Sequence, residues 1–212
     1  MLYCGDCMDV LPTLESKSVD LILVDLPYGV TKNNWDCEID LDLMWKQLRR
    51  ISKPKCNFLF FTTTRYGYKL IQSNPNMFRY DIVWNKPNCN CGHLTANRAV
   101  MRRHEMIYLF GRNSCGTKTY NSQKEDDRHA GSVWTGGGRG KYHQTQKPTD
   151  LLEWLIRTYS NEGDVVLDFT MGSGSCGVAC KNTGREFIGI EKDERIFKIA
   201  EQRVREYFPH TP

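Results

Sequence analysis

Short apolar runs that alternate with amphipathic segments constrain the fold more than any other feature of this chain. Seven runs have the composition of β-strands, at residues 2–4, 20–25, 57–63, 80–86, 105–110, 164–169 and 186–191. Several of them, such as DLILVD and NFLFF, are almost uninterrupted, which is typical of strands covered on both faces. We therefore expect a mostly parallel sheet with helices on both of its faces.

Four segments between these runs carry helical signals, at residues 41–52, 148–160, 175–183 and 193–207. In the first, apolar residues recur at positions 41, 44, 45, 48 and 51, as one face of a helix requires. The second begins with a proline, the third ends at Gly184 and the fourth opens on Asp193; all three are ordinary helix boundaries. The alternation predicts a doubly wound, Rossmann-like α/β fold.

Length and composition fit one domain with a sizeable core, since 40% of the 212 residues are hydrophobic and 25% are charged. No apolar run approaches the roughly 20 residues of a membrane-spanning helix. The N-terminus, MLYCGDCMDV, lacks the basic and apolar blocks of a signal peptide. We therefore expect a single domain over residues 1–212 and a cytoplasmic location.

The nine cysteines raise the question of a metal site or disulfides. Cys4 and Cys7 form one cluster, and Cys89, Cys91 and His93 form another, so that together they offer zinc ligands. Neither cluster has a partner at zinc-finger spacing. The interpretation that we favour is free thiols without a metal, and a zinc site is the alternative.

One segment carries the whole positive excess of the chain. Between Lys86 and Lys147 there are 11 Lys and Arg against 4 Asp and Glu, although the net charge of the chain is only +4. Within this segment, residues 111–145 are rich in Gly, Ser, Asn, Arg and Lys and show no periodicity. Such a long inserted loop is usually functional or disordered. Its charge suits a surface that follows a phosphate backbone, and a solvated basic loop is the alternative.

A glycine loop follows the strand that ends at Asp168. Gly172, Gly174 and Gly177 satisfy G-x-G-x-x-G, a spacing that permits close backbone approach to a ligand at a helix N-terminus. A carboxylate at Asp168 would repel the pyrophosphate of NAD but suits a ligand with an ammonium and a sulfonium. Glu191 closes the next strand, where an acid accepts hydrogen bonds from ribose hydroxyls. These acids favour S-adenosylmethionine over NAD.

A second loop joins an acid, a proline and an aromatic residue at the end of another buried strand, in the order Asp25, Leu26, Pro27, Tyr28. Open α/β sheets bind ligands at that edge. The sequence here resembles the DNA amino-methyltransferases, whose signature is [D/N/S]-P-P-[Y/F]. The resemblance implies that the Asp25 carboxylate and the Leu26 carbonyl accept the hydrogens of an exocyclic amine. It also implies that Tyr28 stacks on a base taken out of the helix.

The resemblance extends over nearly the whole chain. CGDCMDVL at residues 4–11 is similar to the family's opening G-D-x-x-x-x-L, and HQTQKP at residues 143–148 to its H-P-T-Q-K-P element. The glycine loop reads D-F-T-M-G-S-G where D-P-F-M-G-S-G is commoner. The implied cofactor contacts are Asp6, Asp168, Phe169, Thr170, Gly172, Ser173, Gly174, Glu191, His143, Thr145 and Lys147.

The order of these motifs is that of the beta class, in which the catalytic loop precedes the glycine loop and the target-recognition segment lies between them. The resemblance implies a seven-stranded sheet, circularly permuted so that the chain starts at the third strand. Residues 111–145 are the candidate recognition segment. Candidate contacts to DNA are Lys86, Arg98, Arg102, Arg103, Arg139 and Lys141.

The implied activity is methyl transfer from S-adenosylmethionine to adenine N6 within a specific sequence of double-stranded DNA. N4-cytosine is the nearest alternative, although that activity is usually associated with Ser in place of Asp25. A DNA-binding subunit that needs a partner and an NAD-dependent dehydrogenase are alternatives of other classes. A homodimer and a cognate restriction endonuclease are the protein partners that the resemblance raises.

Overall fold

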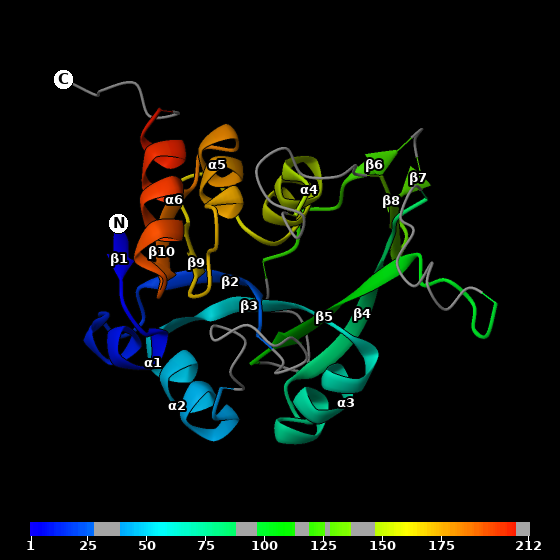
Figure 1. The fold of residues 1–212 in the computed structure, drawn as a ribbon, viewed down its shortest axis with the longest axis horizontal. Helices are drawn as coiled ribbons and strands as arrows, with labels where there is room; N and C mark the ends of the chain where they lie inside the picture. Colours follow the sequence, from blue (N-terminus) through cyan, green and yellow to red (C-terminus); the bar gives the residue numbers. More distant parts are fainter. Residues whose placement is uncertain (28–38, 88–96, 113–118, 126–127, 137–146, 207–212) are drawn as a thin grey trace.

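A twisted sheet of eight strands forms the middle layer of the protein (Figure 1). The computed structural model describes residues 1–27, 39–87, 97–112, 119–125, 128–136 and 147–206. In spatial order the strands are β1 (Leu2–Cys4), β10 (Glu186–Glu191), β9 (Val165–Asp168), β2 (Val19–Asp25), β3 (Ser52–Thr62), β5 (His104–Gly111), β4 (Phe78–Asn85) and β8 (Val133–Thr135). A separate two-stranded sheet pairs β6 (Lys124–Glu125) with β7 (Arg128–His129).

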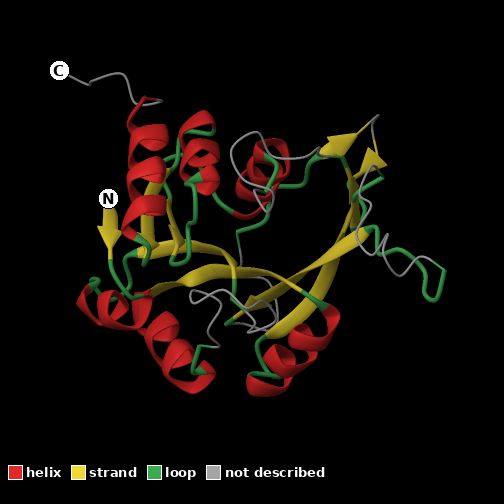
Figure 2. Cartoon of the chain, viewed as in Figure 1, coloured by secondary structure: helices red, strands yellow, loops and turns green. Residues whose placement is uncertain are grey.

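Helices cover both faces of the large sheet (Figure 2). On one face lie α1 (Cys7–Val10), the 3₁₀ turn η1 (Leu11–Thr13), α2 (Leu41–Ile51) and α3 (Thr64–Ser73). On the other face lie α4 (Thr149–Tyr159), α5 (Ser175–Asn182) and α6 (Glu194–Glu206). The structure therefore confirms the doubly wound α/β fold.

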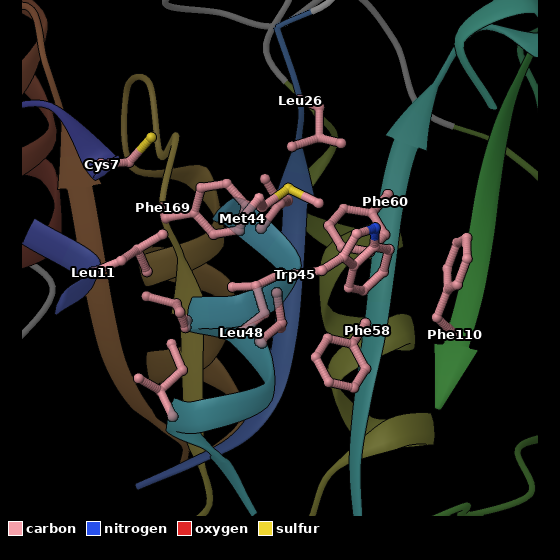
Figure 3. Close-up of a cluster of buried hydrophobic side chains, with 14 of the residues drawn as sticks. Cys7, Leu11, Leu26, Met44, Trp45, Leu48, Phe58, Phe60, Phe110 and Phe169 are labelled. Atoms are coloured by element: carbon pink, nitrogen blue, oxygen red, sulfur yellow. The ribbon is translucent and has the colours of Figure 1, made fainter. Parts of the chain in front are cut away.

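Each face of the sheet packs into its own hydrophobic core. The first core joins α2 to the sheet through Met44, Trp45 and Leu48, and the Trp45 ring meets Phe60 with its edge at a centroid distance of 5.5 Å (Figure 3). The second core joins α4 and α5 to the opposite face. Residues Leu21 to Val24 of β2 are buried throughout because they face both cores in turn, which explains the uninterrupted apolar run.

The strand directions bring several chain segments to one edge of the sheet. In the large sheet, all neighbouring strands pair in parallel except β5, which is antiparallel to both β3 and β4. The carboxyl ends of β1, β10, β9, β2, β3 and β4 consequently lie at the same edge as the first residues of β5. Ligands of open α/β sheets bind at this carboxyl edge.

The seven predicted strands and four predicted helices are all present, with helix boundaries that differ by one residue. Sequence reasoning missed α3 because Gly67 interrupts its interior. That glycine is required, since a Cβ atom there would lie 2.2 Å from the Tyr108 ring. It also missed β6, β7 and β8 within residues 111–145, because strands of two or three residues leave no period to detect. Since β8 pairs with β4, the large sheet has eight strands and not the expected seven.

None of the helices in the described part of the chain is long and apolar enough to cross a bilayer. Within those same residues, no group of three His, Cys, Asp or Glu side chains is placed to hold a metal ion. Cys4, Cys7, Cys56, Cys176 and Cys180 are free thiols. Cys89, Cys91 and His93 lie outside the described residues.

Phe169 belongs to the first core, where its side chain is 1% exposed and lies near Met44 (Figure 3). Replacing it with alanine should lower the free energy of unfolding by about 3–5 kcal/mol, because a large cavity is left in a packed core. Urea denaturation of the purified variant measures this. Tyr68→Ala, which removes an aromatic ring that is 64% exposed, is the matched control and should change stability little. A Phe169→Ala variant as stable as the wild type would place the ring outside the core.

Candidate active site

The loop after β2 and the loop after β9 are held together by a hydrogen bond. The Thr170 hydroxyl donates to the backbone carbonyl of Asp25, with Oγ1 and O 2.9 Å apart. Asp25 is the last residue of β2, and its side chain is partly exposed at the carboxyl edge. The structure therefore brings together the acid of the predicted catalytic turn and the predicted glycine loop, which are 145 residues apart in sequence.

Leu26 anchors the start of the catalytic turn. Its side chain is only 2% exposed and packs in the first core, near Met44 and Phe169 (Figure 3). An apolar side chain thus stands where the family pattern has a proline. Pro27 lies partly buried beside it. Tyr28, the predicted stacking residue, lies outside the described residues.

The glycine loop turns sharply at two left-handed residues. Gly172 has a φ of +52° and Gly174 a φ of +78°, values that side chains other than glycine rarely adopt. Gly174 also packs closely against α6, since a Cβ atom there would lie 3.1 Å from the Ala200 Cβ. The structure therefore explains these two glycines through backbone conformation and helix packing, and their predicted contact with a ligand stays a prediction.

Glu191 closes the glycine loop from the neighbouring strand. Its Oε2 accepts a hydrogen bond from the Gly172 amide at 3.0 Å, and its Oε1 accepts one from the Asp193 amide at 2.8 Å. Each carboxylate oxygen has two lone pairs, so Glu191 keeps further capacity to accept hydrogen bonds. It supports the loop, and its contact with a ribose stays a prediction.

Asp168 is a buried acid, with 8% of its surface exposed. Burial raises its pKa to about 8, and the negative charges of Asp25 and Glu191 add to the shift. A hydrogen bond from the Thr170 amide to Oδ1, at 3.1 Å, partly offsets this. A carboxyl group in this position favours a cationic ligand, because a nearby positive charge would stabilise its ionised form.

Asp6 and Ser173 lie at the margins of this loop. Asp6 caps α1 by accepting from the Met8 amide at 2.9 Å, and its Oδ2 pairs with the Lys192 ammonium at 2.9 Å. The hydrogen bond from Lys192 lowers the pKa of Asp6. Ser173 accepts hydrogen bonds from Arg203 of α6 through its carbonyl and, at 2.8 Å, through its hydroxyl. The Phe169 side chain points into the core instead.

Lys147 lies between two acids from different strands. Its Nζ is 2.5 Å from Asp25 Oδ2 and 3.4 Å from Glu105 Oε2, and it lies over the Phe61 ring, 5.1 Å from the ring centroid. Burial alone would lower the pKa of Lys147, but the charges of Asp25 and Glu105 outweigh it and raise the pKa. Lys147 is therefore a charged partner of the predicted catalytic acid in this structure.

A family model described as DNA methylase, of the N6/N4 type, matches residues 19–202. The protein belongs to the N6/N4 DNA methylase family. The chain is 28% identical to the type II methyltransferase M.HinfI of Haemophilus influenzae over 97% of this chain and 68% of that protein. It is also 28% identical to M1.MboII of Moraxella bovis over 92% of both proteins.

Solved structures share the fold of this DNA methylase. The M1.HpyAVI–SAM complex superposes with a TM-score of 0.75 at 26% identity and covers 96% of this chain and 98% of that one. The cytosine-N4-specific PvuII DNA methyltransferase superposes with a TM-score of 0.78 at 15% identity and covers 97% of this chain and 90% of that one. At that identity the second match shows the fold alone.

The predicted DNA contacts of the methylase fall into three groups. Arg98, Arg102 and Arg103 are exposed just before β5, at the carboxyl edge. Lys86 instead pairs with Glu105 and lies over the Trp84 ring, 4.4 Å from the centroid, so its contact with phosphate stays a prediction. Arg139 and Lys141 lie outside the described residues, as do two predicted cofactor contacts, His143 and Thr145.

Sequence reasoning missed Glu105, because this acid belongs to no motif and lies at the start of a strand. The acid lies at the amino end of β5, and only the antiparallel direction of that strand brings it to the carboxyl edge. Trp84, at the end of the neighbouring strand β4, is a core residue, because its ring is buried against Phe61. A prediction that β5 runs antiparallel would have placed Glu105 at the carboxyl edge and identified it as a candidate.

The raised pKa of Asp168 makes the stability of the methylase depend on pH. The carboxyl group ionises near 3.8 in the unfolded chain and near 8 in the folded protein. As the pH rises through this window, the unfolded state releases its proton first and the folded state loses stability. Asp168→Asn should therefore raise the free energy of unfolding by at least about 1 kcal/mol at pH 8, with no gain near pH 4.

Urea denaturation at several pH values measures this gain. Asp81→Asn, which neutralises an exposed acid on β4, is the matched control and should show no such trend. An Asp168→Asn variant with the same pH dependence as the wild type would contradict the buried, protonated acid.

Proposed function

We propose that the protein transfers a methyl group from S-adenosylmethionine to the N6 atom of adenine, within a specific DNA sequence. The hydrogen bond from Thr170 to the Asp25 carbonyl carries the proposal, because it fixes the acid of the catalytic turn beside the loop for the methyl donor. The relatives named type II methyltransferases support the same chemistry. The protein's cofactor is S-adenosylmethionine, as in the M1.HpyAVI complex.

The residues around the glycine loop fit this cofactor. Asp168 is a buried carboxyl group whose pKa of about 8 would fall beside a positive charge, and Gly172 permits close backbone approach. Asp168, Thr170, Gly172 and Gly174 would hold the cofactor, with Glu191 at its ribose and Asp6 nearby. When bound, S-adenosylmethionine supplies an electrophilic methyl group on a cationic sulfur.

Asp25 and Leu26 prepare the amine for transfer. An exocyclic amino nitrogen is a poor nucleophile because its lone pair is delocalised into the ring. The Asp25 carboxylate and the Leu26 carbonyl accept the two N–H hydrogens, which draws the nitrogen toward a tetrahedral geometry and frees the lone pair. The amine is paired in the duplex, so the base has to leave the helix. The buried Leu26 side chain keeps this carbonyl in place.

Asp25 favours adenine over cytosine, because a serine usually occupies this position in N4-cytosine enzymes. The fold does not separate the two activities, since the cytosine-specific PvuII enzyme has the same architecture. We further propose that residues 111–145 read the DNA sequence within a single methyltransferase domain. The exposed Arg98, Arg102 and Arg103 would contact phosphates beside the site.

Methyl transfer from labelled S-adenosylmethionine to DNA, followed by sequencing that reports modified bases, tests the function. We expect N6-methyladenine within one short sequence. N4-methylcytosine would assign the alternative base. Binding of DNA without transfer by the isolated chain would favour a subunit that needs a partner.

Asp25→Ala should lower the rate of methyl transfer by about 1,000-fold or more, because the amine loses its main acceptor. Cofactor affinity, measured by calorimetry, should change little. Asp81→Ala, at an exposed position on β4, is the control and should transfer at the wild-type rate. A normal rate in Asp25→Ala would refute the assigned role.

Cofactor affinity should rise with pH up to about 8, by at most about tenfold per pH unit. The reason is that the cationic ligand favours ionised Asp168, so binding below this pH has to expel a proton. Asp25, Glu191 and Lys147 also face Asp168. The Asp168→Asn variant should remove the pH dependence of cofactor affinity, which assigns that dependence to Asp168. Calorimetry with S-adenosylmethionine measures it, and NAD, for which we expect no binding, is the negative control. A constant affinity from pH 6 to 8 would contradict the prediction.

A further inference from the structure

Lys147 occupies the place on Asp25 that the proposed function gives to the amine of the target base. Its ammonium donates to Asp25 Oδ2 at 2.5 Å. The base amine needs an acceptor on the same carboxylate, and it gains positive charge as the methyl group arrives. An ammonium that stayed on Asp25 would compete for this acceptor and repel the developing charge.

Glu105 offers Lys147 a second place. Its Oε2 is 3.4 Å from the Lys147 Nζ, which is ion-pair distance but longer than an ordinary charged hydrogen bond. This oxygen is buried, and no donor among the described residues makes a hydrogen bond to it. The other oxygen, Oε1, is held by Lys86. Lys86 thus fixes the Oε1 atom of Glu105, and the Oε2 atom can accept a hydrogen bond from a second cation.

The strand order supplies a short path between the two acids. β3 lies between β2 and β5, and its residue Phe61 is paired with Asp25 in the sheet. The Lys147 ammonium lies over the Phe61 ring, which stabilises a cation along the path. A small shift of the Nζ atom therefore moves the ammonium from one carboxylate to the other. The Phe61 ring stabilises the positive charge during this shift.

We propose that Glu105 is a positioning residue that takes the Lys147 ammonium from Asp25 when the target amine enters. This inference rests on the proposed function, because it concerns the same acid. Lys147 stays protonated throughout, and only its hydrogen-bond acceptor changes. Once Lys147 has moved, the negative charge of Asp25 stabilises the amine as it becomes cationic.

The first test needs neither DNA nor methyl transfer. Lysine labelled with ¹³C at Cε reports the titration of Lys147 by NMR, with its signal assigned through Lys147→Met. Asp25→Asn imitates the loss of the first partner, and the Lys147 pKa should stay high because Glu105 accepts the ammonium. In Asp25→Asn/Glu105→Gln the pKa should fall by about one unit or more, because burial acts without a carboxylate on either side.

Among the described residues, the groups that face Lys147 are Asp25 on β2, Glu105 on β5 and, at longer range, Asp168 on β9 and Lys86 beside Glu105. Lys53, which pairs with Asp20 away from the site, is the internal control and should titrate alike in all variants. A pKa that falls as far in Asp25→Asn alone as in the double variant would overturn the proposal, whether or not the protein methylates DNA.

The second test measures entry of the base. DNA that carries 2-aminopurine at the methylated position is titrated into the protein with sinefungin, an unreactive analogue of the cofactor, and the fluorescence reports the unstacked base. Glu105→Gln should weaken this binding about tenfold, because the ammonium stays on Asp25. Addition of Lys147→Met should restore most of it, because no ammonium then competes.

Glu201→Gln, which removes an acid from an exposed ion pair on α6, is the matched control for loss of a paired carboxylate. Sinefungin affinity in each variant, measured by calorimetry without DNA, separates effects on the base from effects on the cofactor. Additive losses in Glu105→Gln/Lys147→Met would assign Glu105 a purely structural role and refute the exchange.

Discussion

The hydrogen bond between the Thr170 hydroxyl and the Asp25 carbonyl joins the two halves of the site. In the proposed function, the half that follows β2 handles the substrate amine, and the half that follows β9 handles the cofactor. Because β2 and β9 are adjacent parallel strands, their carboxyl ends already lie side by side. The side-chain bond then sets the separation of the loops. Methyl transfer requires this level of control, since donor and acceptor have to meet at short range.

Crowded negative charge is the second constraint on the site. Three acids lie close together, and the negative charges of Asp25 and Glu191 raise the pKa of Asp168. The protein relieves the crowding in three ways: Lys147 pairs with Asp25, backbone amides bind Glu191, and burial keeps Asp168 largely protonated at neutral pH. A ligand with positive charge completes this arrangement. Asp168, which would help to bind such a ligand, therefore costs stability in its absence.

The sequence predicted the parts of the candidate site that local chemistry determines. An acid at the end of an apolar run, a glycine spacing and a second acid one strand later identified Asp25, the glycine loop and Glu191, since each motif follows its own strand. It did not find Glu105 or the partner of Lys147. Both depend on the direction of β5 and on contacts between residues more than 40 positions apart, which periodicity does not report. The role of Phe169 also needed the packed core, because a motif position does not show which way a side chain points.

Two departures from the family pattern, at Leu26 and Phe169, have one structural explanation. Leu26 stands where the catalytic turn usually has its first proline, and Phe169 stands where the glycine loop usually has one. A proline stiffens a turn by fixing its own backbone. Here both side chains are buried in the same core, near Met44 of α2 (Figure 3). Packing against α2 thus replaces proline as the restraint on each loop, and Thr170, where a phenylalanine is commoner, links the two loops directly. The two loops of the candidate site are therefore held by packing and by a hydrogen bond in place of the prolines.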